Sequence, residues 1–217
     1  MQAASAACMQ SGKGNYFMHI IIFNGFLGSG KTSLILSLAE FIIRQEESPG
    51  RTDMVIVENE IGETGIDNKV LQNDSYSVKE LFSGCICCTL SSDLVSALNQ
   101  ISEDFDPKHV IVECTGLAYP ANIVSVINKY VNSLSSVRAV TVVDAERWEM
   151  LFEYTPVLLE SQTAEGDIIL INKADAADAD SLRSLTDKIS EINSRAPVFQ
   201  VSAENGIDDA VWHEVLK

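Results

Sequence analysis

Residues 25–32, Gly-Phe-Leu-Gly-Ser-Gly-Lys-Thr, fit the phosphate-binding pattern G-x-x-x-x-G-K-[ST]. An apolar run at 18–23 precedes them and predicts a buried strand, and residues 33–43 behind them predict a helix. A strand, a glycine-rich turn and a helix in this order turn backbone N–H groups and the positive end of a helix toward phosphates. The alternative is a glycine-rich turn with a chance Lys-Thr pair, which does not require these flanking elements.

Each residue of this loop has a predicted role. We expect Lys31 to reach the β- and γ-phosphates and to stabilise charge during catalysis, and the Thr32 hydroxyl to bind Mg²⁺. The other nucleotide contacts predicted around them are Gly25, Gly28, Ser29, Gly30 and Ser33.

Apolar runs and helix-like segments alternate along the rest of the chain. Further strands are expected at 54–57, 77–82, 109–112, 137–143, 167–171 and 198–201. Further helices are expected at 90–101, 120–131, 179–192 and 207–216. This alternation predicts one α/β domain, a three-layer sandwich of the P-loop NTPase type. Its sheet would be mostly parallel, with helices on both faces and ligands at the carboxyl ends of the strands.

Composition narrows the class of partner. The 217 residues carry 31 acidic and 15 basic side chains, a net charge of −16, which disfavours nucleic acid and anionic lipid. No apolar run approaches the roughly 20 residues of a membrane span. Residues 1–15 lack the features of a signal peptide and are expected to be a disordered leader before a nucleotide domain at 16–217. The expected location is cytoplasmic.

The end of the strand at 109–112 adds further residues to the predicted nucleotide site. Glu113 ends an apolar strand and is followed three residues later by Gly116, which predicts a carboxylate for Mg²⁺ and an N–H that senses the γ-phosphate. A plain strand-end glutamate is the alternative. Because Leu117 follows Gly116, the water-orienting glutamine of Ras-like proteins is absent, which predicts low intrinsic turnover.

The stretch 172–175, Asn-Lys-Ala-Asp, predicts selection of guanine over adenine. Asp175 would accept hydrogen bonds from the guanine N1–H and amine, which adenine cannot supply, while Asn172 and Lys173 would support the loop and cover the base. Ser202 and Ala203 are expected to touch the guanine oxygen. An acidic loop without this function is the alternative.

Three thiols, Cys85, Cys87 and Cys88, lie within four residues and can converge on one soft ion such as Zn²⁺ or Co²⁺. Three protein ligands leave a position open, which favours a transfer site. A redox dithiol, with an ATPase as its host, and structural cysteines are the alternatives.

Acidic side chains follow the strand at 54–57, where a switch segment is expected. Glu58 or Glu60, or a partner, would place the attacking water, and Glu63 is an additional candidate metal ligand. A solvated acidic loop is the alternative.

Taken in order, GFLGSGKT, ENEIGE, GCICCTL, ECTG and NKAD resemble the CobW-type family of P-loop GTPases, which are related to the urease and hydrogenase nickel-insertion GTPases. The resemblance spans residues 18–217. It implies Mg²⁺-dependent GTP hydrolysis to GDP, coupled to metal delivery in zinc homeostasis or cobalamin synthesis. It further implies a metalloprotein or cofactor-pathway client and allows a nucleotide-dependent homodimer.

Two departures from the family pattern affect these expectations. The family's smaller C-terminal domain is expected to be absent from this chain, and Ile61 stands where phenylalanine is usual. The competing functional interpretation is a nucleotide-gated regulatory module that activates a metalloenzyme or corrinoid protein without handling metal.

Overall fold

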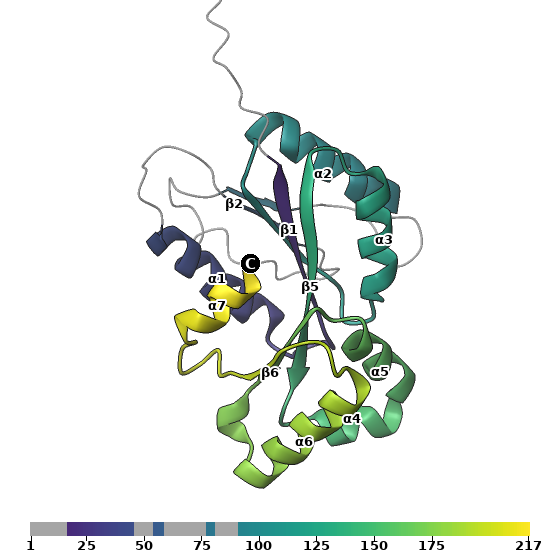
Figure 1. Ribbon diagram of the computed structural model, residues 1–217, viewed down its shortest axis with the longest axis vertical. Coiled ribbons are helices and arrows are strands. Elements are labelled where there is room, and N and C mark those ends of the chain that lie inside the picture. The colour runs from purple at the N-terminus through teal and green to yellow at the C-terminus, as the bar shows by residue number, and fades with distance from the viewer. Residues whose placement is uncertain (1–16, 46–53, 59–76, 81–90) are drawn as a thin grey trace, which may run out of the picture.

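Among the residues that the structure describes, seven strands form one sheet in the order β3-β2-β4-β1-β5-β6-β7, and every pairing between neighbours is parallel. The computed structural model describes residues 17–45, 54–58, 77–80 and 91–217 (Figure 1). The strands are β1 (Met18–Asn24), β2 (Met54–Glu58), β3 (Ser77–Glu80), β4 (His109–Glu113), β5 (Leu134–Asp144), β6 (Ile168–Asn172) and β7 (Val198–Gln200). The predicted α/β class with a parallel sheet is confirmed.

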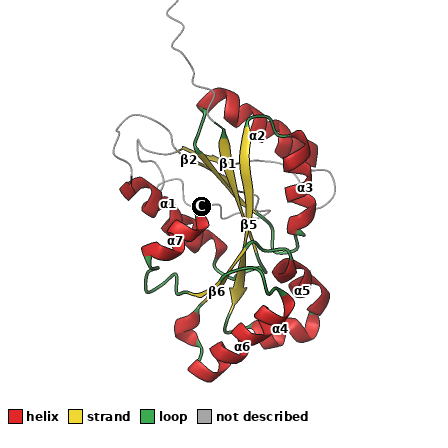
Figure 2. Cartoon of the chain, in the orientation of Figure 1, coloured by secondary structure: helices red, strands yellow, loops and turns green. Residues whose placement is uncertain are grey.

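Helices cover both faces of this sheet (Figure 2). They are α1 (Lys31–Gln45), α2 (Ser91–Phe105), α3 (Pro120–Tyr130), α4 (Trp148–Tyr154), α5 (Pro156–Ala164), α6 (Ala179–Ile192) and α7 (Asp209–Val215), with a 3₁₀ turn at Ala174–Ala176. Helices α1 and α7 lie on one face, opposite α2 and α3 (Figure 1).

Alternation along the strands divides the core between the two faces. In β1, Ile21 and Phe23 pack in the cluster that contains α1 and α7, whereas Ile20 and Ile22 pack in the cluster with α2 and α3. A third cluster joins β5 and β6 to α4, α5 and α6. Because both faces of the sheet are covered, β1, β4 and β6 are buried along nearly their whole length, as is typical of parallel sheets.

The topology places a ligand site at the carboxyl end of β1. The chain first completes one side of β1 with β2, β3 and β4, and then crosses to the other side for β5, β6 and β7. Strand β1 pairs with β4 through Phe23 opposite Glu113, and with β5 through Asn24 opposite Thr141. Ligands of open α/β sheets bind at such a reversal of strand order.

The segment between β5 and β6 is where the sequence-based expectation was incomplete. It contains α4 and α5, neither of which was predicted, and β5 begins at Leu134 rather than at residue 137. Both helices are short, and Pro156 starts the second one directly after Thr155 closes the first. Short helices show few turns of apolar periodicity, which is why the pattern was not visible.

No helix in the described ranges is both long and apolar enough to cross a membrane. The predicted leader at 1–15 lies outside the described residues, as do residues 81 and 82 of the predicted third strand and Leu90 of the following helix.

Candidate nucleotide-binding site

The predicted phosphate loop connects β1 to α1, which begins at Lys31. Two of its glycines are required by close contacts as well as by positive φ angles. A Cβ atom on Gly25 (φ 138°) would lie 2.2 Å from the Val142 carbonyl oxygen, and one on Gly30 (φ 92°) would lie 2.2 Å from Nδ2 of Asn172. The loop is therefore pressed against β5 and the end of β6, and no larger residue fits at either position.

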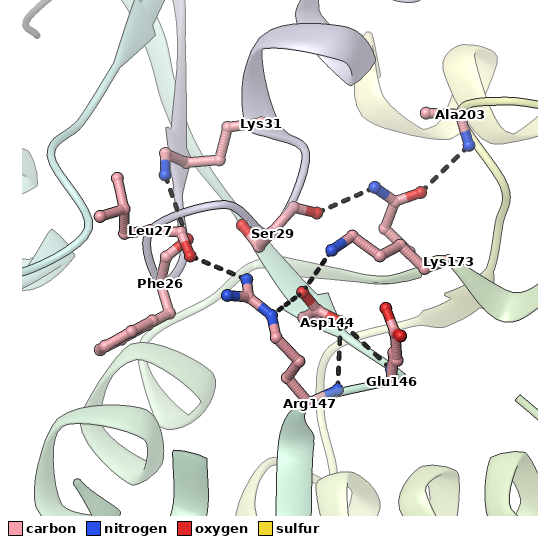
Figure 3. Close-up of polar contacts among 10 residues, drawn as sticks. Phe26, Leu27, Ser29, Lys31, Asp144, Glu146, Arg147, Lys173 and Ala203 are labelled. Atoms are coloured by element: carbon pink, nitrogen blue, oxygen red, sulfur yellow. Dashed lines mark hydrogen bonds and ion pairs between the residues drawn. The ribbon is translucent and has the colours of Figure 1, made fainter. Parts of the chain in front are cut away.

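Lys31 is 4% exposed, and its side chain folds back over the loop (Figure 3). Its Nζ atom donates to the carbonyl oxygens of Gly25 at 3.1 Å and Phe26 at 3.3 Å. The ammonium group is thus held inside the curve of the loop, where its charge is shielded from water and acts strongly on a bound anion.

Thr32 and Glu113 are brought together from α1 and the end of β4. The Thr32 hydroxyl lies 2.9 Å from Oε1 and 3.0 Å from Oε2 of Glu113, whose side chain is buried. A hydroxyl and a carboxylate are ligand types that Mg²⁺ prefers, so the residues present fit this ion. Gly116 packs on the phosphate loop, since a Cβ atom there would lie 2.5 Å from the Leu27 nitrogen.

Cys114 follows Glu113 and is fully buried with a free thiol. Burial raises the pKa of this thiol to about 12, and the neighbouring Lys31 only partly opposes that effect. The thiol therefore stays protonated at neutral pH, which makes it a poor nucleophile. Cys114 is thus a packed thiol next to the end of the strand.

Asn172 connects three segments of the site. Its Nδ2 atom donates to the Ser29 carbonyl oxygen at 2.9 Å, and its Oδ1 atom accepts from the Ala203 N–H at 3.1 Å. A cavity of about 380 Å³ adjoins it. The predicted site residues that line this cavity are Gly30, Ser33, Asn172, Lys173, Asp175 and Ala203. Residues from three distant segments therefore meet in one pocket, as the motifs require.

Ser202 is the predicted base-loop residue that does not line this cavity. Its hydroxyl accepts from the Asn205 N–H at 3.2 Å, and its backbone forms an isolated bridge with Gly206. These contacts close the turn after β7. The structure thus gives Ser202 a local role in supporting the neighbouring Ala203.

Asp144 and Arg147 were not predicted as site residues. Asp144 ends β5, and its Oδ2 atom accepts from Lys173 Nζ and from Arg147 Nε, both at 2.7 Å. Arg147 in turn donates through Nη2 to the Leu27 carbonyl oxygen at 2.8 Å (Figure 3). One buried carboxylate thus joins the loop at 172–175 to the phosphate loop. Its signal was present in the sequence: like Glu113, Asp144 is a carboxylate directly after an apolar strand.

The pKa of Asp144 reflects these contacts. Burial pushes the pKa up, but the hydrogen bonds from Lys173 and Arg147 outweigh burial and lower the pKa below its usual value. Because the folded pKa lies below the unfolded value near 3.8, the ionised group stabilises the fold above about pH 4. That stabilisation decreases as the pH falls through the folded pKa.

We therefore expect Asp144→Asn to lower the free energy of unfolding by about 2 kcal/mol at pH 7, because two cations lose a charged acceptor. The difference from the parent chain should narrow below about pH 4. Urea unfolding at pH 7 and pH 3 measures both values. Asp180→Asn is the control, since Asp180 is 92% exposed and should change stability by less than about 0.5 kcal/mol. A difference that stays constant with pH would contradict the argument.

Several of the predicted site residues belong to segments that the structure does not describe. Glu60, Glu63, Cys85, Cys87 and Cys88 lie outside the described residues, and of Glu58 only the main chain at the end of β2 is described. Among the residues with described positions, no three His, Cys, Asp or Glu side chains gather as a metal site.

Curated relatives include zinc chaperones. The chain is 32% identical to "Zinc chaperone CobW" of a Sinorhizobium species over 85% of this chain and 58% of that protein. It is 30% identical to "Zinc chaperone YjiA" of Escherichia coli K12 over 84% of this chain and 57% of the relative. The chain thus spans a little over half the length of these two relatives.

Solved structures show the same fold. The zinc-bound YjiA GTPase from E. coli superposes with a TM-score of 0.61 at 23% identity, over 92% of this chain and 62% of that one. The hydrogenase maturation factor HypB from Archaeoglobus fulgidus gives a TM-score of 0.64 at 16% identity, over 92% and 91% of the two chains.

The family model for the nucleotide-binding domain of CobW, HypB and UreG matches residues 19–200, a range that runs from β1 to β7 and contains nearly all of the site described above. This chain therefore belongs to the CobW/HypB/UreG family.

Proposed function

We propose that this chain binds GTP with Mg²⁺, hydrolyses it slowly to GDP, and uses the nucleotide state to control the handling of a transition metal. The observation that carries the proposal is the convergence of the Thr32–Glu113 pair with the Asp175 pocket on one phosphate loop. The first feature suits a metal-bound triphosphate and the second suits a guanine base.

The phosphate end depends on fixed positive groups. Loop N–H groups and the buried ammonium of Lys31 would stabilise negative charge on the transferring phosphoryl group. Mg²⁺ held by Thr32 and Glu113 would supply further charge neutralisation. The water must be positioned by Glu58 or Glu60, or by a partner, because Leu117 follows Gly116. Slow turnover without a partner follows from this.

The metal end of the proposal rests on the thiols and on the relatives. Cys85, Cys87 and Cys88 would bind the metal as cargo, with Glu63 as an additional ligand. Relatives named zinc chaperones, and a "Zinc-regulated GTPase metalloprotein activator 1" of Schizosaccharomyces pombe at 27% identity, make zinc the first candidate. Cobalt, which thiolates also bind, is the second candidate. The client would be a metalloprotein in the cytoplasm, and GTP could assemble a homodimer.

A zinc titration in two nucleotide states tests the coupling. Zinc affinity, measured by competition with a chelator, should differ at least tenfold between the complex with a non-hydrolysable GTP analogue and Mg²⁺ and the complex with GDP. Replacing the three cluster cysteines with serine should abolish tight zinc binding, whereas Cys8→Ser, a cysteine remote from the motifs, should not.

The outcomes separate the competing functions. Equal zinc affinities in the two states would overturn the coupling. Tight zinc binding by the triple serine variant would overturn the assignment of the cluster. A chain whose client activation survives loss of the three thiols would be a nucleotide-gated regulator that does not transfer metal.

A further inference from the structure

We infer that Gln162 on α5 is a positioning residue for the turn after β4, and that it sets how much more tightly the site holds a nucleoside triphosphate than a diphosphate. The inference rests on the proposed role of Gly116 in sensing the third phosphate.

Gln162 is 1% exposed and binds that turn through both hydrogens of its amide nitrogen. The Nε2 atom lies 3.2 Å from the carbonyl oxygen of Gly116 and 2.9 Å from that of Ala118. A backbone hydrogen bond from the Ala118 N–H to the Thr115 oxygen at 3.0 Å closes the same turn. Because both partners of Gln162 are carbonyl oxygens, only its nitrogen can face them, and the orientation of the amide is fixed.

The backbone of Gln162 is itself held against the sheet beside the phosphate loop. The Thr141 hydroxyl lies 2.8 Å from the Gln162 carbonyl oxygen and 3.2 Å from Oδ1 of Asn24. All three side chains are buried, and Asn24 is the last residue before Gly25. A continuous set of buried polar contacts therefore runs from the start of the phosphate loop to the carbonyls of the turn.

The amide oxygen of Gln162 indicates that the residue is not there to stabilise the fold. Within the described part of the chain, Oε1 of Gln162 is buried and has no hydrogen-bond partner. A buried acceptor without a partner is destabilising, and a leucine of similar size would not carry that cost. What leucine could not do is donate to Gly116 and Ala118.

Fixing this turn in advance should raise the affinity for GTP more than the affinity for GDP. Gly116 packs against Leu27 of the phosphate loop, and in the role proposed for it above its N–H would meet the third phosphate. A turn fixed in advance loses little conformational freedom when that phosphate binds. Without Gln162 the turn must be ordered during binding of the triphosphate, whereas a diphosphate does not reach it.

The test compares two ligands in one series of variants. Dissociation constants for GDP and for a non-hydrolysable GTP analogue, each with Mg²⁺, are measured on Gln162→Leu by calorimetry. We expect affinity for the analogue to fall five- to tenfold and affinity for GDP to stay within twofold. Thr141→Val, which removes the hydrogen bond to the Gln162 carbonyl oxygen, should shift the same ratio by a smaller factor. Gln100→Leu, at an exposed site on α2, should leave both values unchanged.

Each other outcome has a defined meaning. An unchanged ratio, a raised affinity for the analogue, or an equal loss for both nucleotides would overturn the role of Gln162. If Gln162→Leu does not fold, Gln162→Met carries the same comparison with the same criteria, and Thr141→Val carries it with the smaller shift stated above. Failure of the parent chain to bind either nucleotide would instead overturn the proposed function.

Discussion

Asp175→Asn is expected to lower the affinity for GTP by about 10³-fold, because two hydrogen bonds from guanine to one charged acceptor are replaced by a single neutral one. Asp175 is exposed and lines the cavity beside Asn172 and Lys173, where its carboxylate can meet the edge of a bound base. The same change should raise the affinity for xanthosine triphosphate, since xanthine carries an oxygen where guanine has its amine and an asparagine amide can donate to it.

Competition of unlabelled GTP, ATP and xanthosine triphosphate against a fluorescent nucleotide measures this change in selectivity. Asp187→Asn serves as the control, because Asp187 is exposed on α6 and away from the cavity. Equal losses for GTP and ATP, with no gain for xanthosine triphosphate, would mean that the substitution damaged the loop and that Asp175 does not read the base.

Lys31→Ala is expected to slow GTP hydrolysis by about 10²- to 10³-fold, the usual cost of removing one fixed donor from a developing negative charge. The effect should be large because Lys31 is buried within the loop and so acts through a low local dielectric. Single-turnover hydrolysis of bound GTP isolates this step from nucleotide exchange. Lys188→Ala, at an exposed lysine paired with Glu149, is the matched control and should hydrolyse GTP at the parent rate.

Loss of Lys31 also leaves the carbonyl oxygens of Gly25 and Phe26 without this donor, so folding must be checked separately. The melting temperature without nucleotide reports on that effect. A variant with an unchanged rate of hydrolysis would remove Lys31 from the mechanism, whatever its stability.

Much of the fold could be predicted because local patterns and chain topology agree. The apolar runs before Gly25, before Glu113 and before Asn172 are buried strands, and each ends at the site edge of the sheet. The residues after a strand are forced toward one edge when all strands are parallel, so motifs far apart in sequence could be expected to meet. The approach of Asn172 to Ser29 is an instance.

The contacts that depend on tertiary packing could not be predicted. Nothing in the local sequence marks Gln162 as a partner of Gly116. Its helix is short, and Gln162 lies 44 residues along the chain from Ala118. The pairing of Arg147 with the Leu27 oxygen likewise depends on how α4 meets the phosphate loop. Such side chains satisfy backbone groups of another segment, which composition and periodicity do not encode.

The position of β1 has a consequence for how the protein is made. Strand β1 precedes the other described strands of the sheet in the chain, yet its neighbours β4 and β5 begin at His109 and Leu134, and the loop after it is held by Asn172. A chain emerging from the ribosome must therefore keep an apolar strand unpaired until most of the domain has been translated. In the proposed function the nucleotide site is complete only after that late closure, so GTP occupancy would distinguish finished molecules from nascent ones.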